Sequence, residues 1–290
     1  MVTNTPEEIE VEIFGGIGNQ LFQFAAGRYL ETHHGVICKY SGWRTGYKVK
    51  LPFLQKNMKE KALRPFSLLA ERILSRVIVL RRIEMFYRNV YVSQPIGWDP
   101  ELARKVPGKR LRGYFQSHIY ASSLDAVDKN LILELKNASQ WYKSMLAQIQ
   151  DLDVVAVHIR RGDYKNNPDI GTLDMEYYLR ALAQIDGNMQ LENVWIFSDD
   201  RNVGDELRRK LGACAQLVIQ DENASDFESL VLMSRAKKII IANSTYSWWA
   251  AFLAMDGTKV FAPSKWFKSL NDPIDLIPDH WTRVESTWES

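Results

Sequence analysis

The chain has 290 residues, of which 46% are hydrophobic and 25% charged, and its formal net charge is +2. These values are ordinary for a globular protein, and so small a net charge gives no general affinity for nucleic acid. No apolar run reaches the roughly 20 residues that a membrane-spanning helix needs, and the polar N-terminus does not resemble a signal peptide. Cys38 and Cys214 lie far apart and fit no metal-binding spacing, so we expect reduced thiols in a cytoplasmic protein.

The chain opens with a strand, a glycine-rich turn and a helix. A strand is predicted over residues 9–14, where hydrophobic and acidic residues alternate, and a helix over residues 21–30. This order is typical of the start of a Rossmann-like domain. Gly16 and Gly18 would let a ligand approach the backbone, and the amide of Asn19 could bind sugar hydroxyls. A third glycine of the dinucleotide fingerprint is missing, so a simple tight turn remains an alternative.

The following stretch gives weaker signals. Residues 38–61 are predicted to be loop-rich, and their aromatic side chains could line an acceptor sugar or simply pack in the interior. A short strand is predicted over residues 110–115, with Tyr114–Ser117 as an exposed turn after it. Residues 121–149 are predicted to be helical.

Residues 56–88 form a basic segment. They include nine basic and three acidic residues, which gives the segment a charge of +6 and leaves −4 for the rest of the chain. Hydrophobic residues recur between the charges at helical spacing, as in helices that lie on anionic membranes. One interpretation is therefore peripheral contact with the inner face of a membrane. The other is the solvated face of a helix that packs on the core.

The second half of the chain alternates strands with helices. Strands are predicted over residues 154–159, 194–197, 217–219, 238–242 and 259–262, and helices over residues 174–185, 203–211, 226–236 and 248–255. This alternation indicates βαβ units and a parallel sheet. We place a domain boundary near Asp151, with an N-terminal domain over residues 1–150 and a C-terminal domain over residues 151–290.

The strongest local signal is the sequence Val154–Tyr164. An unbroken hydrophobic run, typical of a strand buried on both faces, ends abruptly in His158, Arg160, Arg161 and Asp163. Ligands of parallel α/β sheets bind beyond the carboxyl ends of the strands. Because a guanidinium group binds phosphate through two parallel hydrogen bonds, the motif predicts a phosphate or diphosphate clamp. A basic surface loop is the alternative.

Two further strands end in polar clusters that should reach the same sheet edge. One cluster is Asp199 and Asp200, and the other comprises Asn243, Ser244, Thr245 and Ser247. The second cluster precedes a helix, so its hydroxyl groups could bind phosphate or could merely cap the helix. The two aspartates could bind a ribose, a guanine edge or a metal. Since Arg160 already compensates diphosphate charge, we predict no metal.

The sequence His158–Tyr164 resembles the central motif of the α-1,2-fucosyltransferases, the bacterial type of glycosyltransferase family 11. Gly15–Ala25 resembles the N-terminal motif of that family, and the clusters at Ser198–Asp200 and Asn243–Trp249 resemble its later motifs. The resemblance runs from about residue 9 to residue 266. It implies an α/β, GT-B-like fold in which two Rossmann-like domains face a cleft, with the acceptor on the N-terminal side and GDP-fucose on the C-terminal side.

The resemblance also implies inverting transfer of fucose from GDP-fucose to the 2-hydroxyl of a terminal galactose, in a surface glycan such as O-antigen and without a metal. Arg160 would hold the β-phosphate, His158 and an aspartate would contact the nucleotide, and Asn19 would face the reaction centre. Asp163 is either the general base or a partner that orients an arginine. A transferase of another nucleotide sugar and an inactive nucleotide-sugar-binding module remain alternatives.

Overall fold

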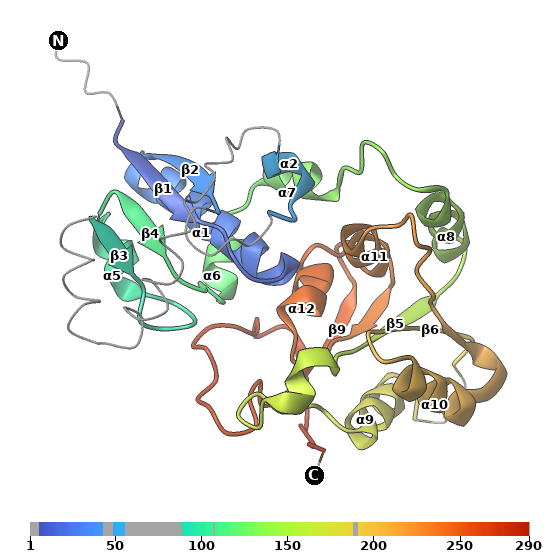
Figure 1. Cartoon of the computed structure of the whole chain (residues 1–290). Helices are drawn as coiled ribbons and strands as arrows, with labels where there is room; N and C mark the ends of the chain where they lie inside the picture. The colour runs from blue at the N-terminus through green and yellow to red at the C-terminus, as the bar shows by residue number, and fades with distance from the viewer. Residues whose placement is uncertain (1–5, 43–48, 56–88, 107, 188–190, 290) are drawn as a thin grey trace. The chain divides into compact units, whose positions relative to one another are not determined.

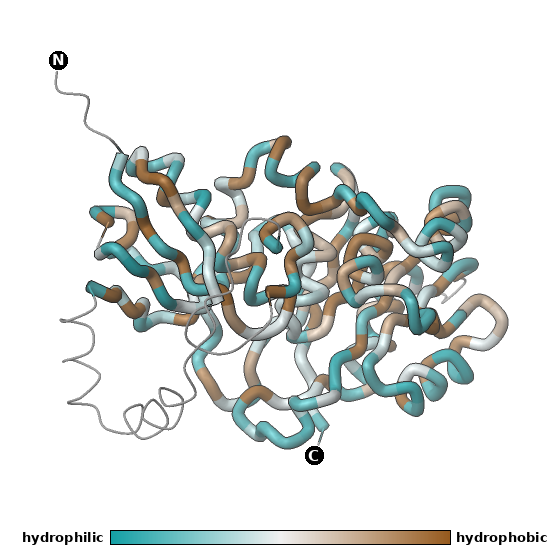
Figure 2. Tube along the Cα trace, turned by 45° about the horizontal axis from the view of Figure 1, so that its top comes forward, coloured by the Kyte–Doolittle hydropathy of each residue, from teal (hydrophilic) through white to brown (hydrophobic). Residues whose placement is uncertain are grey.

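The structure is a computed structural model that describes residues 6–42, 49–55, 89–106, 108–187 and 191–289. The chain forms two compact units. The first comprises Met1–Ile132 and Pro273–Leu276, and the second Leu133–Asp272 and Ile277–Ser290. In Figure 2, hydrophobic stretches lie inside each unit, while hydrophilic stretches run along its outer helices and loops. The basic segment at residues 56–88 and most aromatic residues of the predicted acceptor rim lie outside the described residues.

The first unit is an α/β unit with a parallel sheet (Figure 1). Its elements are β1 (Glu8–Glu12), α1 (Ile17–His34), β2 (Ile37–Ser41), α2 (Pro52–Gln55), β3 (Val90–Val92), α5 (Pro100–Arg104), β4 (Arg110–Arg112), α6 (His118–Ala121) and α7 (Ala126–Leu133). The described strands pair in the order β2-β1-β4-β3, all parallel. β1 and β4 are the two central strands of this sheet.

The second unit has a six-stranded parallel sheet in its described part. Its elements are α8 (Gln140–Gln150), β5 (Val154–Ile159), the 3₁₀ helix η1 (Gly162–Asn166), α9 (Met175–Ile185), β6 (Asn193–Ser198), α10 (Arg201–Leu211), η2 (Gly212–Cys214), β7 (Ala215–Leu217), α11 (Asp226–Met233), β8 (Lys238–Ile240), α12 (Thr245–Phe252), β9 (Lys259–Pro263) and β10 (Thr282–Val284). Helices α9 and α10 lie on one face, and α8, α11 and α12 on the other (Figure 1).

The strand order β7-β6-β5-β8-β9-β10 is the doubly wound order of a Rossmann fold, with β5 as the first strand. Every residue of β5 is buried, as its hydrophobic sequence predicted. The direction of winding reverses between β5 and β8, so the segments after these two strands flank the ligand-binding edge. The predicted fold class, α/β with two Rossmann-like units, is confirmed.

Several predicted elements differ from the structure. The stretch predicted to be helical over residues 121–149 holds two helices, α7 and α8, because the polar residues between them favour a turn and Ser139 caps α8. β2 lies in a stretch predicted to be loop-rich. The predicted exposed turn is exposed only at Tyr114, whereas Phe115, Gln116 and Ser117 are buried.

The two units meet in the sequence at residues 132 and 133, earlier than the predicted boundary near Asp151. The reason is that α8 is bonded to the second unit. The backbone N–H of Ser139 donates to Glu228 Oε1 at 2.5 Å, and the indole N–H of Trp141 donates to the carbonyl of Ile219 at 2.9 Å. Among the described helices, none is long and apolar enough to cross a membrane.

Glu228 should stabilise the second unit because it accepts hydrogen bonds at the starts of two helices, α8 and α11. Its buried carboxylate also accepts from the backbone N–H of Ser225, the N-cap of α11, at 2.7 Å. Glu228→Ala removes both charged acceptors and leaves two N–H groups unsatisfied, so we expect the free energy of unfolding to fall by about 2–4 kcal/mol. Urea denaturation followed by tryptophan fluorescence measures this loss. The exposed Glu222→Ala is the matched control, and equal midpoints for the two variants would contradict the role.

Candidate active site

The turn after β5 is held against the end of β6 by one carboxylate. The backbone N–H of Arg161 donates to Asp199 Oδ1 at 2.8 Å. A Cβ atom on Gly162 would lie 2.7 Å from Asp199 Oδ2, so a residue with a side chain would push this carboxylate away. Because Ile159 and Ser198 are paired in the sheet, the two polar turns lie side by side. The predicted meeting of these strand ends is therefore observed.

Arg160 is the most accessible arginine of this turn. Its guanidinium lies 2.5 Å from Asp163 Oδ1 and 3.0 Å from Asp199 Oδ2, and about a third of its side chain is exposed. Its Cζ lies 5.4 Å from the ring centre of Tyr164, within cation–π range. Burial opposes the charge, but the carboxylates of Asp199 and Asp163 outweigh it and raise the pKa of Arg160. The side chain is thus a permanently charged and oriented group.

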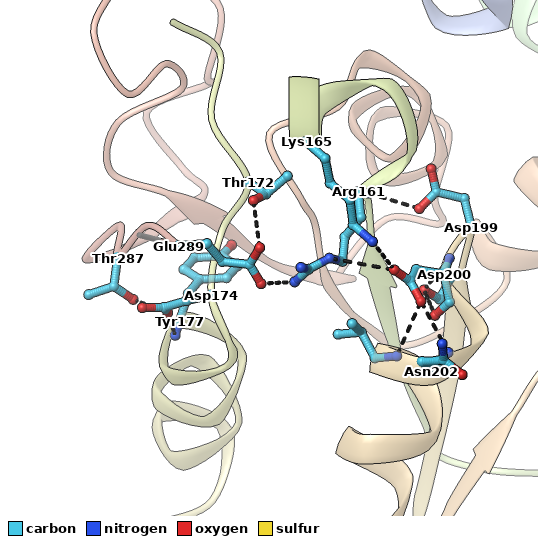
Figure 3. A network of polar contacts seen from close by, with 12 residues as sticks. Arg161, Lys165, Thr172, Asp174, Tyr177, Asp199, Asp200, Asn202, Thr287 and Glu289 are labelled. Atoms are coloured by element: carbon cyan, nitrogen blue, oxygen red, sulfur yellow. Dashed lines mark hydrogen bonds and ion pairs between the residues drawn. The ribbon is translucent and has the colours of Figure 1, made fainter. Parts of the chain in front are cut away.

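Arg161 faces a different set of partners (Figure 3). Its guanidinium forms an ion pair with Glu289, near the C-terminus, and its Nε lies 3.7 Å from Asp200 Oδ2. Only 14% of its side chain is exposed. Separating a buried charge from its partners is unfavourable by several kcal/mol, on the order of 3–5. The two consecutive arginines therefore differ, since only Arg160 has room for a ligand.

Asp200 stabilises the start of α10. Its Oδ1 accepts from the backbone N–H groups of Asn202 and Val203, and its Oδ2 lies 2.6 Å from Lys165 Nζ. The hydrogen bond from Lys165 lowers the pKa of Asp200 and keeps it ionised. Asp199 and Asp200 are both neutralised by protein cations, so their charges already have a function within the protein.

His158 and Asn243 bring buried polar atoms to the ends of β5 and β8. Within the described residues, His158 Nδ1 and Asn243 Oδ1 have no hydrogen-bond partner. The Asn243 amide donates to the carbonyl of Gly171 at 3.1 Å. Burial, and then the charge of Arg160, lower the pKa of His158 to about 3. A group with so low a pKa is a weak general base near neutral pH, but its neutral ring can still form hydrogen bonds.

The residues at the start of α12 differ in how deeply they are buried. Ser244 is the N-cap, and its hydroxyl hydrogen-bonds to Tyr164, whose ring lies beside Arg160. Thr245 is the first helical residue, at the helix end whose dipole favours anions. Ser247 is fully buried and donates to the carbonyl of Ser244 at 3.2 Å. Ser247 therefore supports the turn. Ser244 is also buried, with 4% of its surface exposed, whereas Thr245 is half-buried and better placed to bind a ligand.

In the first unit, the predicted residues lie beyond the end of β1. Gly16 is the exposed N-cap of α1, while Gly18 and Asn19 lie in its first turn. The left-handed conformation of the turn belongs to Gly15 rather than Gly16, which has a φ of −74°. Asn19 Oδ1 accepts from Gln116 Nε2 at 3.1 Å.

Sequence reasoning missed four residues that hold these groups: Gln116, Tyr164, Lys165 and Glu289. Tyr164 is the last residue of the arginine motif and Lys165 directly follows it, so both could have been found by their proximity. Gln116 and Glu289 are distant in sequence from their partners and carry no local signal. The described residues include no group of three or more His, Cys, Asp or Glu side chains that could hold a metal ion; metal independence remains a prediction.

The buried imidazole of His158 should make stability depend on pH. Its pKa is about 3 in the folded chain, against an ordinary value of 6.5. Between these values the unfolded chain binds a proton that the folded chain does not, so stability falls as the pH drops below 6.5. We expect a slope of up to about 1.4 kcal/mol per pH unit from this group. Urea denaturation between pH 7 and pH 5 should show a flatter slope for His158→Gln than for the exposed control His280→Gln, and equal slopes would refute the assignment.

Comparison with known proteins identifies the family. The family model described as glycosyl transferase family 11 matches residues 111–275, more than half of the chain. The O-antigen biosynthesis glycosyltransferase WbnK of Escherichia coli is 26% identical, with 93% of this chain and 98% of that protein covered. An alpha-1,2-colitosyltransferase of Escherichia coli is 25% identical over 96% of this chain and 99% of its own length. Among solved structures, the fucosyltransferase NodZ from Bradyrhizobium gives a TM-score of 0.47 at 14% identity, covering 87% of this chain and 94% of that one. This protein belongs to glycosyl transferase family 11.

Proposed function

We propose that the protein is an inverting galactoside α-1,2-fucosyltransferase. It transfers L-fucose from GDP-β-L-fucose to the 2-hydroxyl of a terminal galactose in a surface glycan or oligosaccharide. Family membership supports glycosyl transfer, and the name of a Caenorhabditis elegans relative, galactoside 2-alpha-L-fucosyltransferase, supports the sugar and the linkage. That relative is 25% identical over 57% of this chain.

The observation that carries the proposal is the position of Arg160. Its guanidinium lies beyond the carboxyl end of β5, at the switch point of a doubly wound sheet, and is only partly buried. Ser244 and Thr245, which follow β8 on the other side of the switch point, supply hydroxyl groups and the start of α12. A diphosphate needs this combination of fixed positive charge and hydrogen-bond donors.

In this proposal, donor binding exchanges partners at Arg160. Both terminal nitrogens contact carboxylates, and phosphate oxygens would take the place of one of them. Asp199 is anchored by the backbone of Arg161, whereas the side chain of Asp163 is 72% exposed. An exposed ion pair contributes about 0–1 kcal/mol, so Asp163 is the contact that is easily given up.

In the mechanism that we propose, the galactose 2-hydroxyl attacks the anomeric carbon of fucose from the face opposite GDP. The bond to the diphosphate oxygen breaks, and the configuration inverts. Arg160, Ser244 and Thr245 stabilise the charge that develops on the leaving diphosphate. The acceptor is assigned to the first unit. The sequence predicts Gly16 and Gly18 of that unit as donor contacts, of which Gly16 is exposed and Gly18 is buried in α1.

The proton of the acceptor hydroxyl needs a base. His158 is unsuited because its pKa is about 3. Asp163 can act first as an ion-pair partner of Arg160 and then as the base. In the structure it pairs with Arg160, but once phosphate replaces it, its carboxylate is released and can accept a proton.

Transfer of colitose is a second candidate, since one relative is an alpha-1,2-colitosyltransferase. Colitose is fucose without the 3-hydroxyl group. A site that hydrogen-bonds this hydroxyl rejects the deoxy sugar by about 10⁴-fold or more, whereas a hydrophobic site discriminates weakly. Comparing kcat/KM for the GDP derivatives of the two sugars separates the candidates.

The cellular setting that we propose is the cytoplasm, with peripheral contact to anionic membrane through residues 56–88. The name of the relative WbnK supports a role in the assembly of surface polysaccharide. The charge of +6 on this segment is the observation behind membrane contact.

The decisive experiment is transfer itself. The protein is incubated with GDP-fucose and lactose or a type 1 or type 3 disaccharide, and the linkage is determined by NMR. We expect an α-1,2 product, inhibited by GDP more than by UDP. Arg160→Ala should lower turnover by about 10²–10³-fold, because a donor to the leaving group is lost. The matched control Arg180→Ala removes an arginine from the surface of α9 and should leave turnover unchanged. Transfer from UDP sugars alone, or binding without transfer, would contradict the proposal.

We further expect activity without a metal ion. The positive charge of Arg160 compensates the leaving diphosphate, so excess EDTA should leave the rate of fucose transfer unchanged. The rate is measured before and after exhaustive chelation. A loss that Mn²⁺ restores would contradict this prediction and make Asp199 and Asp200 candidate metal ligands.

A further inference from the structure

The last described residues run along the start of α9 and reach the active site. Trp288 forms an antiparallel bridge with Leu173. On either side of this bridge, the backbone N–H of Asp174 donates to the carbonyl of Thr287, and the backbone N–H of Glu289 donates to the carbonyl of Thr172, both at 3.0 Å. The position of Glu289 is therefore determined by main-chain hydrogen bonds.

Further contacts fix the main chain and the side chain of Glu289. Its main-chain carbonyl accepts from Lys268 Nζ at 2.8 Å. Its Oε2 accepts from the hydroxyl of Thr172 at 2.9 Å, and its Oε1 pairs with the guanidinium of Arg161 (Figure 3). A carboxylate held at both oxygens and at its own backbone is a rigid anchor for the arginine.

A continuous set of contacts leads from this anchor to Arg160, the residue proposed to bind phosphate. Glu289 holds the side chain of Arg161, and the backbone N–H of Arg161 holds Asp199 at 2.8 Å. The other oxygen of Asp199 lies 3.0 Å from Arg160. Glu289 is therefore connected to Arg160 through two intermediate residues, Arg161 and Asp199.

We propose that Glu289 is a positioning residue for the donor diphosphate. It keeps Arg161 turned away from the ligand and, through Asp199, keeps Arg160 in its binding orientation. This inference rests on the proposed function, because it assigns Glu289 to the GDP-binding side of that site.

Two substitutions distinguish an effect of the position of the Glu289 carboxylate from an effect of its charge. Glu289→Gln removes the charge, and Glu289→Asp keeps the charge but withdraws it by one methylene. If position matters, both variants bind GDP more weakly, with Kd raised by about tenfold for Glu289→Gln, the effect of one lost charge-assisted contact. If only charge matters, Glu289→Gln binds GDP more tightly, because a negative charge near the diphosphate is gone, and Glu289→Asp is unchanged.

The matched control is Glu285→Gln. Glu285 belongs to the same C-terminal segment and pairs with Arg180 at 2.7 Å, but its side chain is 76% exposed and contacts no arginine of the β5 turn. GDP binding is measured by isothermal titration calorimetry, and thermal unfolding is followed in parallel. We expect Glu285→Gln to bind GDP as the wild type does.

The outcomes are distinct. Weaker GDP binding in both Glu289 variants, without a change in the control, supports the positioning role. Unchanged or tighter binding, or a lower Tm with unchanged Kd, overturns it while leaving the proposed function intact. A wild-type protein that binds no nucleoside diphosphate would overturn the proposed function and this role together.

Discussion

Asp199 joins two consecutive arginines through contacts of different kinds. One oxygen accepts from the main chain of Arg161 and the other pairs with the side chain of Arg160. The first contact fixes the turn after β5 against the end of β6, and the second aims a guanidinium beyond the sheet edge. Gly162 permits this arrangement because a side chain there would collide with the carboxylate. The orientation of Arg160, the residue proposed to bind phosphate, depends on these contacts of Asp199.

The charges around the bridge explain why neighbouring arginines have separate functions. Four carboxylates, Asp163, Asp199, Asp200 and Glu289, surround the three cations Arg160, Arg161 and Lys165. A diphosphate adds further negative charge, so it can bind only by replacing a carboxylate. The anchored carboxylates hold their positions, while Asp163 is exposed and pairs with Arg160. The site is therefore oriented in advance, and a phosphate can take the place of Asp163.

The first unit uses the same principle with neutral groups. Asn19 lies beyond β1, and Gln116 follows β4, the neighbouring central strand. Their amide groups hydrogen-bond, so the orientation of Asn19 depends on a residue distant in sequence. Phe115, next to Gln116, has a φ of 54°, a conformation that a bulky residue adopts only under constraint from its surroundings. In both units, a polar side chain beyond a central strand is oriented by a partner from the neighbouring strand.

The amino-acid sequence by itself determined the central strands, the alternation of strands and helices, and the residues at the ends of β5, β6 and β8. Buried strands and polar strand ends leave strong local patterns. The strands that sequence reasoning missed, β2, β3 and β10, are all sheet edges, where partial burial weakens the pattern. The sequence and its family resemblance also singled out Arg160 as the residue that binds phosphate. Only the tertiary structure shows why Arg161 differs, because Glu289 and Asp200 reach Arg161 from distant parts of the chain. A single charged residue has no periodicity, so its partner is defined by the fold and not by its neighbours in sequence.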